Sequence, residues 1–301
     1  MNVRAVVWAV QGEDMRYKDL SEFLAQKNTI KGPIALIIAE DTVELHSTIG
    51  HYQKLGFGTV VLFVHPNTPL SPDLEASLPV IEHDLSQHEA AMEIVNRLIP
   101  AVTGQWVYYG YNAEYLFFPF CETRSIKEVI AFHTEERRSA FLSYVIDLYA
   151  LDLEQNPNAV NLTEAHLDRS GYYALGRATP QGANRPPERQ LDFYGGLRWR
   201  FEEHIPPQRR KIDRISLFKA KAGLKMRPNH TFNDEEYNTY SCPWHHNITT
   251  AVMSFRTAKA LKLNPGSRFD IKSFQWRNSQ AFEWDSQQLM DLGLIEPGQW
   301  F

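Results

Sequence analysis

The stretch from Ile34 to Val64, IALIIAEDTVELHSTIGHYQKLGFGTVVLFV, decides the fold class of this chain. It opens with a continuous apolar run, which is typical of a strand buried on both faces. The apolar residues from Val43 to Leu55 then recur at helical spacing, and two glycines break this pattern before a second apolar run begins. A strand, a helix and a strand in this order predict one unit of a parallel sheet.

The same alternation continues on both sides of this unit. An apolar run over residues 4–10 precedes it, a helical pattern over 86–99 follows it, and residues 106–109 form another expected strand. Strands separated by helices predict an α/β fold, in which a mostly parallel, Rossmann-like sheet carries helices on both faces. The ligand crevice of such a sheet lies at the carboxyl ends of its strands.

The character of the sequence changes beyond about residue 150. Tyr, Asn, Arg and Pro become frequent, and the apolar runs become short. We therefore expect residues 1–150 to form the main α/β half. Residues 151–301 are expected to form a C-terminal elaboration packed on the same core, so that the whole chain is a single domain.

Composition excludes several classes of function. A chain of 301 residues with 43% hydrophobic side chains can bury a large core. The net charge of −5 leaves no surplus of positive charge for a nucleic-acid backbone, so no nucleic-acid partner is expected. No apolar stretch of about 18 residues and no secretory signal pattern is present, which predicts a cytoplasmic protein with no transmembrane segment.

Further motifs follow the first stretch in a fixed order. They are SQHEAAMEIVNRLI (86–99), WVYYGYNAEYLFFP (106–119), ETRSIKEVIAFHTEERRSAFLSYVIDLYA (122–150), YGGLRWRF (194–201), KIDRISLFKAKAG (211–223), PNH (228–230) and HHNITTAVMSF (245–255). As a series they resemble the family-2-like glycosyltransferases, which have the GT-A fold and bind nucleotide sugars. The resemblance covers most of the chain. It implies transfer of a sugar from a nucleotide-sugar donor to a glycan or a small acceptor.

The metal motif of these relatives is changed in this chain. Their strand matching 106–109 runs into Asp-x-Asp-Glu-Phe-Leu, whose aspartates hold a divalent metal ion on the donor diphosphate. Here Tyr111 and Ala113 replace both aspartates, and only Asn112 and Glu114 remain as oxygen ligands. Because Mg²⁺ and Mn²⁺ prefer carboxylate oxygens, we expect no tightly bound metal, and at most weak binding of Mg²⁺ or Mn²⁺ together with a nucleotide sugar.

The other donor-side positions are also changed. Glu40 and Asp41 stand where relatives often have Asn-Glu, and the acidic pair after the next strand is replaced by a segment containing His65 and Asn67. The resemblance places these four residues at the donor site together with Tyr111 and Asn112. In that position Tyr111 could stack on a base or a sugar.

A set of cations in the second half could replace the metal. Arg198 and Arg200 would share one face if their segment were a strand, and Gly195-Gly196 would let backbone approach a ligand closely. With Lys211, these arginines are candidates for stabilising the departing diphosphate. A turn with solvated arginines explains the pattern equally well.

Acidic residues and histidines are the candidate catalytic groups. By resemblance, Glu114 is the surviving acid of the metal motif, and a general base for the acceptor hydroxyl is sought among Glu114, Asp234 and Glu235. The resemblance also places His230 and His246 on the wall facing the acceptor, where a histidine could donate to a leaving phosphate. Each histidine is equally well explained as a hydrogen-bonded structural residue.

Two other functions stay open. The changed motifs also fit a non-catalytic member of the fold, a pseudoenzyme that binds a nucleotide, a sugar or a protein through the old crevice. A more remote alternative is a metallohydrolase that uses a Cys/His site around Cys242, His245 and His246 together with His230. The chain has only two cysteines and lacks the repeated spacing of zinc fingers, so this alternative has the weakest support.

Overall fold

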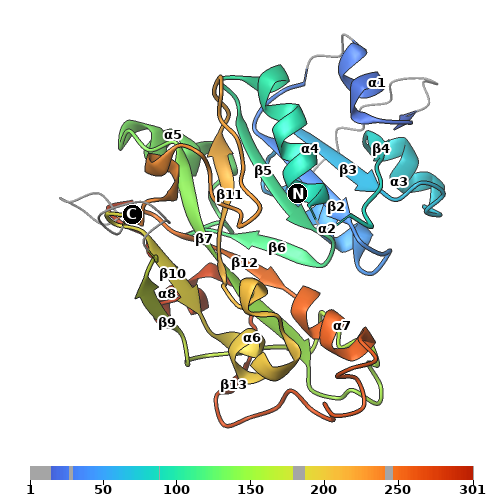
Figure 1. Ribbon diagram of the computed structural model, residues 1–301, viewed down its shortest axis with the longest axis vertical. Coiled ribbons are helices and arrows are strands. Elements are labelled where there is room, and N and C mark those ends of the chain that lie inside the picture. The colour runs from blue at the N-terminus through green and yellow to red at the C-terminus, as the bar shows by residue number, and fades with distance from the viewer. Residues whose placement is uncertain (1–14, 27–29, 88, 179–186, 241–246, 301) are drawn as a thin grey trace, which may run out of the picture.

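The computed structural model describes residues 15–26, 30–87, 89–178, 187–240 and 247–300. A sheet of eleven strands runs through the molecule (Figure 1). Its first part is parallel and has the spatial order β1 (Arg16–Tyr17), β4 (Val80–Glu82), β3 (Thr59–Val64), β2 (Ile34–Ala39) and β5 (Trp106–Tyr111). The strand, helix and strand predicted within 34–64 are thus confirmed as β2, α2 (Leu45–Lys54) and β3. The strand expected over 4–10 lies outside the described residues.

The sheet continues with strands from both halves of the chain. Its further order is β11 (Asp213–Lys219), β7 (Ala140–Ala150), β12 (Thr250–Ser254) and β6 (Glu114–Phe117). β11 is antiparallel to both of its neighbours, β12 is parallel to β7, and β6 is antiparallel to β12. The fold is therefore a mixed α/β fold with a parallel core, in which β2, β5, β7 and β12 all run in the same direction.

Helices cover both faces of the sheet, as the sequence predicts. Alternate residues of β2 point to opposite faces: Leu36 and Ile38 pack in one core cluster, and Ala35 and Ile37 pack in another. The first cluster includes residues of α1 (Leu20–Ala25) and α4 (Ala90–Leu98). The second includes residues of α2, α3 (Pro72–Ser77) and α5 (Ile126–Glu135). This two-sided burial explains why β2 reads as a continuous apolar run.

The second half adds a smaller layer beside the carboxyl ends of these strands. It contains α6 (Gly196–Arg200) and α7 (Arg256–Leu263). The second half also forms the two-stranded sheet of β9 (Tyr173–Gly176) and β10 (Leu191–Tyr194), and α8 (Ser286–Asp291), which begins beside Glu122 after β6. β8 (Ala165–Asp168) pairs with the far part of β7 and with β13 (Ser279–Ala281). Among the described residues, no helix is both long enough and apolar enough to cross a membrane.

The order of the parallel strands reverses between β2 and β5. From β2 the chain moves outward on one side to β3 and then β4, and it returns to pair β5 with the other side of β2. In open α/β sheets the ligand crevice lies outside the carboxyl ends of the two strands at such a reversal. The residues that follow β2 and β5 are therefore the first place to look for a site.

Two glycines give a matched test of the packing around β2 and β3. A Cβ on Gly58 would lie 2.6 Å from the Lys31 carbonyl oxygen, whereas a Cβ on Gly50, which is exposed on α2, would meet no atom within 4 Å. We expect Gly58→Ala to lower the free energy of unfolding by about 1–3 kcal/mol, because backbone must move. Gly50→Ala should raise it by up to about 1 kcal/mol, because alanine favours helix. Urea unfolding measures both, and equal effects would contradict this packing.

Candidate functional site

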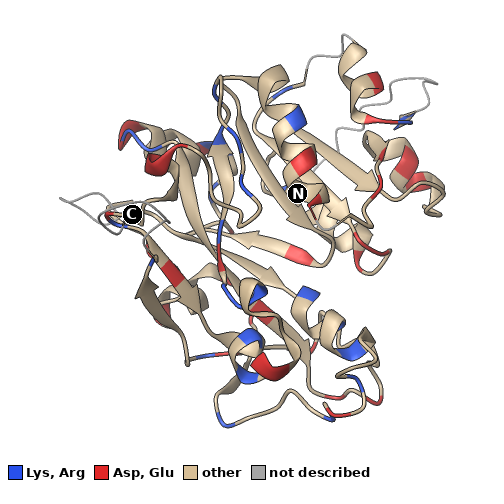
Figure 2. Cartoon of the chain, viewed as in Figure 1, with Lys and Arg blue, Asp and Glu red and all other residues tan. Residues whose placement is uncertain are grey.

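Charged residues gather at the carboxyl edge of the parallel strands. Glu40 and Asp41 follow β2, Asn112 follows β5, Asp147 lies near the end of β7, and Arg256 follows β12. Figure 2 shows residues of both charge signs around α6 and α7, the helices nearest this edge. We refer to these residues and their ion-pair partners as the charged edge.

Asn112 ties the two strands of the reversal together. Its Oδ1 accepts a hydrogen bond from the Glu40 amide at 3.0 Å, and its Nδ2 donates to Asp41 Oδ1 at 2.5 Å and to the Val43 carbonyl at 2.9 Å. The side chain is fully buried. Its amide is thus committed to holding the turn after β2, and its oxygen already has a partner.

Two cations from α7 neutralise the acids after β2. Arg256 donates from Nε and Nη2 to the two oxygens of Glu40, both at 2.6 Å, and Lys259 donates to Asp41 Oδ2 at 2.8 Å. Burial alone would raise the pKa of Glu40, but the Arg256 guanidinium lowers it. Arg256 also stacks over the Tyr111 ring at 3.7 Å. The predicted stacking partner of a ligand is therefore covered by an arginine of the same chain.

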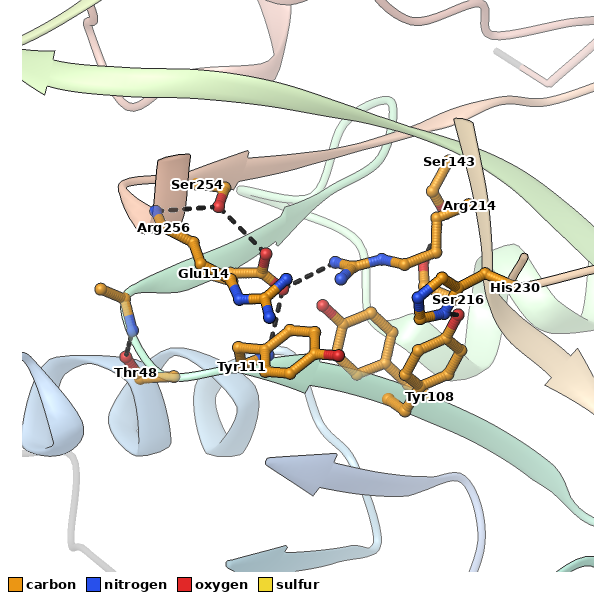
Figure 3. A network of polar contacts seen from close by, with 12 residues as sticks. Thr48, Tyr108, Tyr111, Glu114, Ser143, Arg214, Ser216, His230, Ser254 and Arg256 are labelled. Atoms are coloured by element: carbon orange, nitrogen blue, oxygen red, sulfur yellow. Dashed lines mark hydrogen bonds and ion pairs between the residues drawn. The ribbon is translucent and has the colours of Figure 1, made fainter. Parts of the chain in front are cut away.

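Glu114 is the centre of a buried network, which Figure 3 shows. Its Oε2 accepts from Arg214 at 2.6 Å and from the Tyr111 amide at 3.0 Å, and its Oε1 accepts from Ser254 Oγ at 3.0 Å. Burial would raise the pKa of Glu114, but Arg214 lowers it. A carboxylate that is held by an arginine and has a lowered pKa is a poor proton acceptor. These contacts favour a role for Glu114 in holding β6 against β11 and β12.

The residues at the changed metal motif do not fit a divalent cation. Tyr111 and Ala113 offer no carboxylate, the Asn112 amide is bonded within the chain, and Glu114 is paired with Arg214. In the ranges that the structure describes, no group of three or more His, Cys, Asp or Glu residues could hold a metal ion. Ammonium and guanidinium groups instead stand beside the carboxylates that follow β2.

Sequence reasoning missed Asp147, a buried carboxylate at this edge. In the sheet register Asp147 of β7 pairs with Ser254, which in turn pairs with Glu114. Its side chain is 1% exposed, Arg198 Nε lies 3.7 Å from Oδ1, and neither oxygen has a hydrogen bond within the described residues. Burial raises the pKa of Asp147, and Arg198 offsets only part of that shift. The one sequence signal was an aspartate inside an otherwise apolar strand.

Gly196 explains how the chain passes so close to Asp147. Its φ is +62°, and a Cβ there would lie 2.9 Å from Asp147 Oδ2. Both features require glycine. The expected close approach at Gly195-Gly196 thus exists, and what the chain approaches in this structure is its own carboxylate.

The expected strand around Arg198 and Arg200 is wrong, because these residues form helix α6. Residues two apart on a helix point to different sides. Arg198 donates to the Lys211 carbonyl at 2.5 Å and lies beside Asp147, whereas Arg200 pairs with Asp168 at 3.0 Å. The two arginines do not converge on one anion here. Of the pair, only Arg198 belongs to the charged edge.

The third predicted cation has a separate partner. Lys211 Nζ lies 2.6 Å from Asp192 Oδ2, on the strand β10.

At the donor side, Val64 of β3 pairs with Ala39 of β2, so His65 follows at the same edge as Glu40. The side chain of His65 is 57% exposed, and Asn67 is exposed in the same turn. Neither residue joins the buried network.

The remaining catalytic candidates lie apart from Glu114 or outside the described residues. Asp234 pairs with Lys221, just after the end of β11, where Lys219 faces Trp106 at the start of β5. This is the opposite edge of the sheet from the charged edge. Glu235 pairs with Arg227 at 2.7 Å. His246 lies outside the described residues, as do Cys242 and His245.

Of the two histidines predicted for the acceptor wall, His230 lies in the part of the chain that the structure describes. Its Nδ1 lies 3.0 Å from the Tyr109 hydroxyl, and the two rings are stacked at 5.9 Å. The guanidinium of Arg214 stands over the Tyr109 ring at 5.5 Å, so His230 lies next to the Glu114 network (Figure 3).

Removing one partner of the Glu114–Arg214 pair tests its structural role. We expect Arg214→Met to lower the free energy of unfolding by about 3–5 kcal/mol, because it leaves a carboxylate buried without compensation. Adding Glu114→Gln should recover part of that loss. Arg227→Met, which breaks an exposed pair, is the control and should cost at most about 1 kcal/mol. Urea unfolding compares the three variants, and a loss for Arg214→Met no larger than the control would contradict this role.

Comparisons with known proteins add little. No family model matches the chain, and no curated protein matches it. Among solved structures, the chain is similar to the crystal structure of TarS 1-349 from S. aureus, with a TM-score of 0.32 and 12% sequence identity. The match covers 76% of this chain and 62% of that one, so the chain spans less than two thirds of its length.

Proposed function

We propose that this chain transfers a sugar from a nucleotide-sugar donor to a glycan or a small acceptor, without a tightly bound metal ion. The observation that carries the proposal is the position of Glu40, Asp41 and Asn112 at the strand reversal between β2 and β5. This is where open α/β sheets bind their ligands. The ordered motif series that resembles family-2-like glycosyltransferases supports the same function.

Arginines at the charged edge supply positive charge for a diphosphate. Arg256 uses Nε and Nη2 on Glu40, and within the described residues its Nη1 donates no hydrogen bond, so Nη1 can donate to a phosphate; the side chain is 35% exposed. Glu40 keeps the pKa of Arg256 raised against the effect of burial, so the guanidinium stays charged. The exposed Arg209 acts on Glu40 through its charge and forms no ion pair within the described residues. Fixed cations of this kind stabilise a departing diphosphate.

Asp147 is the group that we assign as proton acceptor. Glu40, Asp41 and Glu114 are each held by a cation at 2.6 to 2.8 Å, whereas the cation beside Asp147, Arg198, stands 3.7 Å away. Burial moves the pKa of Asp147 upward, toward neutral pH. A general base works best when its pKa lies near the pH of the reaction. Its neighbour Arg198 favours the charged carboxylate, which is the form that takes the proton from the acceptor hydroxyl.

One observation favours a second candidate, a binding protein without catalysis. Arg256 and Lys259 are already paired with Glu40 and Asp41, so the crevice is largely neutralised by its own side chains. A ligand would then bind to a balanced site with no group positioned for reaction. This reading predicts ligand-induced stabilisation without turnover.

Release of nucleoside diphosphate distinguishes the two functions. We expect the wild-type chain, stripped with a chelator, to release nucleoside diphosphate from one member of a nucleotide-sugar panel, and added Mn²⁺ to change the rate little. Arg256→Met and Asp147→Asn should each lower that rate roughly 10²-fold, the scale of losing one electrostatic or acid–base group. Arg227→Met, on an exposed pair, should leave it unchanged.

The pH profile gives an independent readout for Asp147. Because burial raises its pKa, the rate should fall as the pH drops through that raised value, and Asp147→Asn should lose this limb. Thermal stabilisation by a donor without release of nucleoside diphosphate would favour the binding protein. Neither stabilisation nor release with any donor would contradict both functions.

A further inference from the structure

A groove beside α6 has no part in the charged edge. It is a shallow, open hollow of about 540 Å³ lined by Trp199, Arg200, Phe201, Glu202, Glu203 and Trp276. Trp199 is 42% exposed, which makes it the most exposed tryptophan of the described residues. Its indole meets that of Trp276 edge to face, with ring centroids 6.4 Å apart. We call this surface the tryptophan groove.

The aromatic floor of the tryptophan groove is held in place by a buried acid. Asp168 is 1% exposed, and its Oδ1 accepts from Trp276 Nε1 at 2.7 Å, from Tyr149 at 2.6 Å and from Arg200 at 3.0 Å. The Arg200 guanidinium also lies over the Trp276 ring at 4.7 Å. The Trp276 indole is therefore fixed before a ligand binds, and little ordering of this ring is needed on binding.

A glycine supports both indoles from below. A Cβ on Gly171 would lie 3.4 Å from Trp276 Cη2 and 3.6 Å from Trp199 Cζ3, so both rings pack close to its backbone. The φ of Gly171 is +96°, which a residue with a side chain rarely adopts. The backbone at Gly171 thus lets two neighbouring tryptophan rings pack close to it at the surface.

The rim of the tryptophan groove is acidic. The side chains of Glu202 and Glu203 are 56% and 62% exposed. Glu202 Oε2 pairs with Arg210 at 3.1 Å, and Glu203 Oε1 lies 3.8 Å from His204 Nε2, so the other oxygen of each carboxylate can accept a hydrogen bond from a ligand. The charge of Arg200 is compensated by Asp168. Indole faces cover apolar C–H groups, and carboxylates accept from hydroxyls. A pyranose ring presents both kinds of group, and an acidic rim disfavours sugars that are themselves anionic.

We propose that the tryptophan groove binds a neutral oligosaccharide. Its role as the acceptor subsite rests on the sugar transfer proposed above, whereas the binding itself does not. Continuity with the charged edge supports this role, because Arg198 on the same short helix lies beside Asp147 while Trp199 faces the groove. An oligosaccharide on the indoles would lie next to α6, the helix that carries Arg198, the ion-pair partner of Asp147.

Ligand-detected NMR with short cello-, malto- and chito-oligosaccharides tests the binding. The wild-type protein should bind at least one of them, and Trp199→Ala should weaken that binding at least about tenfold, which corresponds to about 1.4 kcal/mol. Trp199→Phe should restore part of the affinity because it restores a ring face. Phe269→Ala is the matched control: Phe269 is 72% exposed and does not line the groove, so affinity should not change. Short oligogalacturonides, which are anionic, should bind more weakly than the neutral sugars.

Several results would overturn this proposal. These are no binding of any neutral oligosaccharide by the wild-type protein, equal binding by wild type and Trp199→Ala, or tighter binding of the anionic sugars. The assay is separate from that of the proposed function. Oligosaccharide binding without nucleoside diphosphate release would support binding at the tryptophan groove and contradict the proposed sugar transfer. Transfer to an acceptor with the same KM in wild type and Trp199→Ala would support the sugar transfer and contradict the groove as the acceptor subsite.

Discussion

The ion pair between Glu114 and Arg214 is the interaction on which the rest of the site depends. It joins β6 to β11 in the interior, and Ser254 of β12 and the Tyr111 amide of β5 complete the shell of the carboxylate. Four strands thus meet at one buried negative charge. A buried charge without a partner is costly, so this shell disfavours separation of the four strands. Ser254 is the last residue of β12, and α7 with Arg256 and Lys259 begins two residues after it.

Charge compensation at this edge comes from the protein itself. The carboxylates after β2 are matched by an arginine and a lysine of α7, and the amide after β5 holds their turn. A guanidinium cannot take over the six-fold oxygen coordination of Mg²⁺, but it carries a fixed charge and directional donors at no cost in dehydrating an ion. Tyr111 and Ala113 carry no charge, and the cations beside the acids after β2 come from α7.

The fold could be read from the sequence to a greater extent than the site. The apolar runs and helical spacing of 34–64 report burial and local geometry, and both are properties of neighbouring residues. The polar residues after β2 and β5 were named from the resemblance, and the rule that strand ends share an edge predicted that they border one crevice. Pairings across the chain are not encoded locally: Lys259 with Asp41 and Arg214 with Glu114 are separated by 218 and 100 residues. Arg198 and Arg200 were misplaced because a five-residue helix is too short to show a period, and Asp147 was overlooked because a single aspartate carries no pattern.

The position of β6 has a consequence for how the chain folds during synthesis. β6 ends at Phe117, yet its strand partner in the described sheet is β12, which begins at Thr250. As the chain emerges from its N-terminal end, the backbone N–H and C=O groups of β6 that will face β12 stay without a strand for more than a hundred further residues. Unpaired strand edges readily join other chains. In this interval, α2 is the element already made that covers part of β6, through His51 and the Leu116 carbonyl.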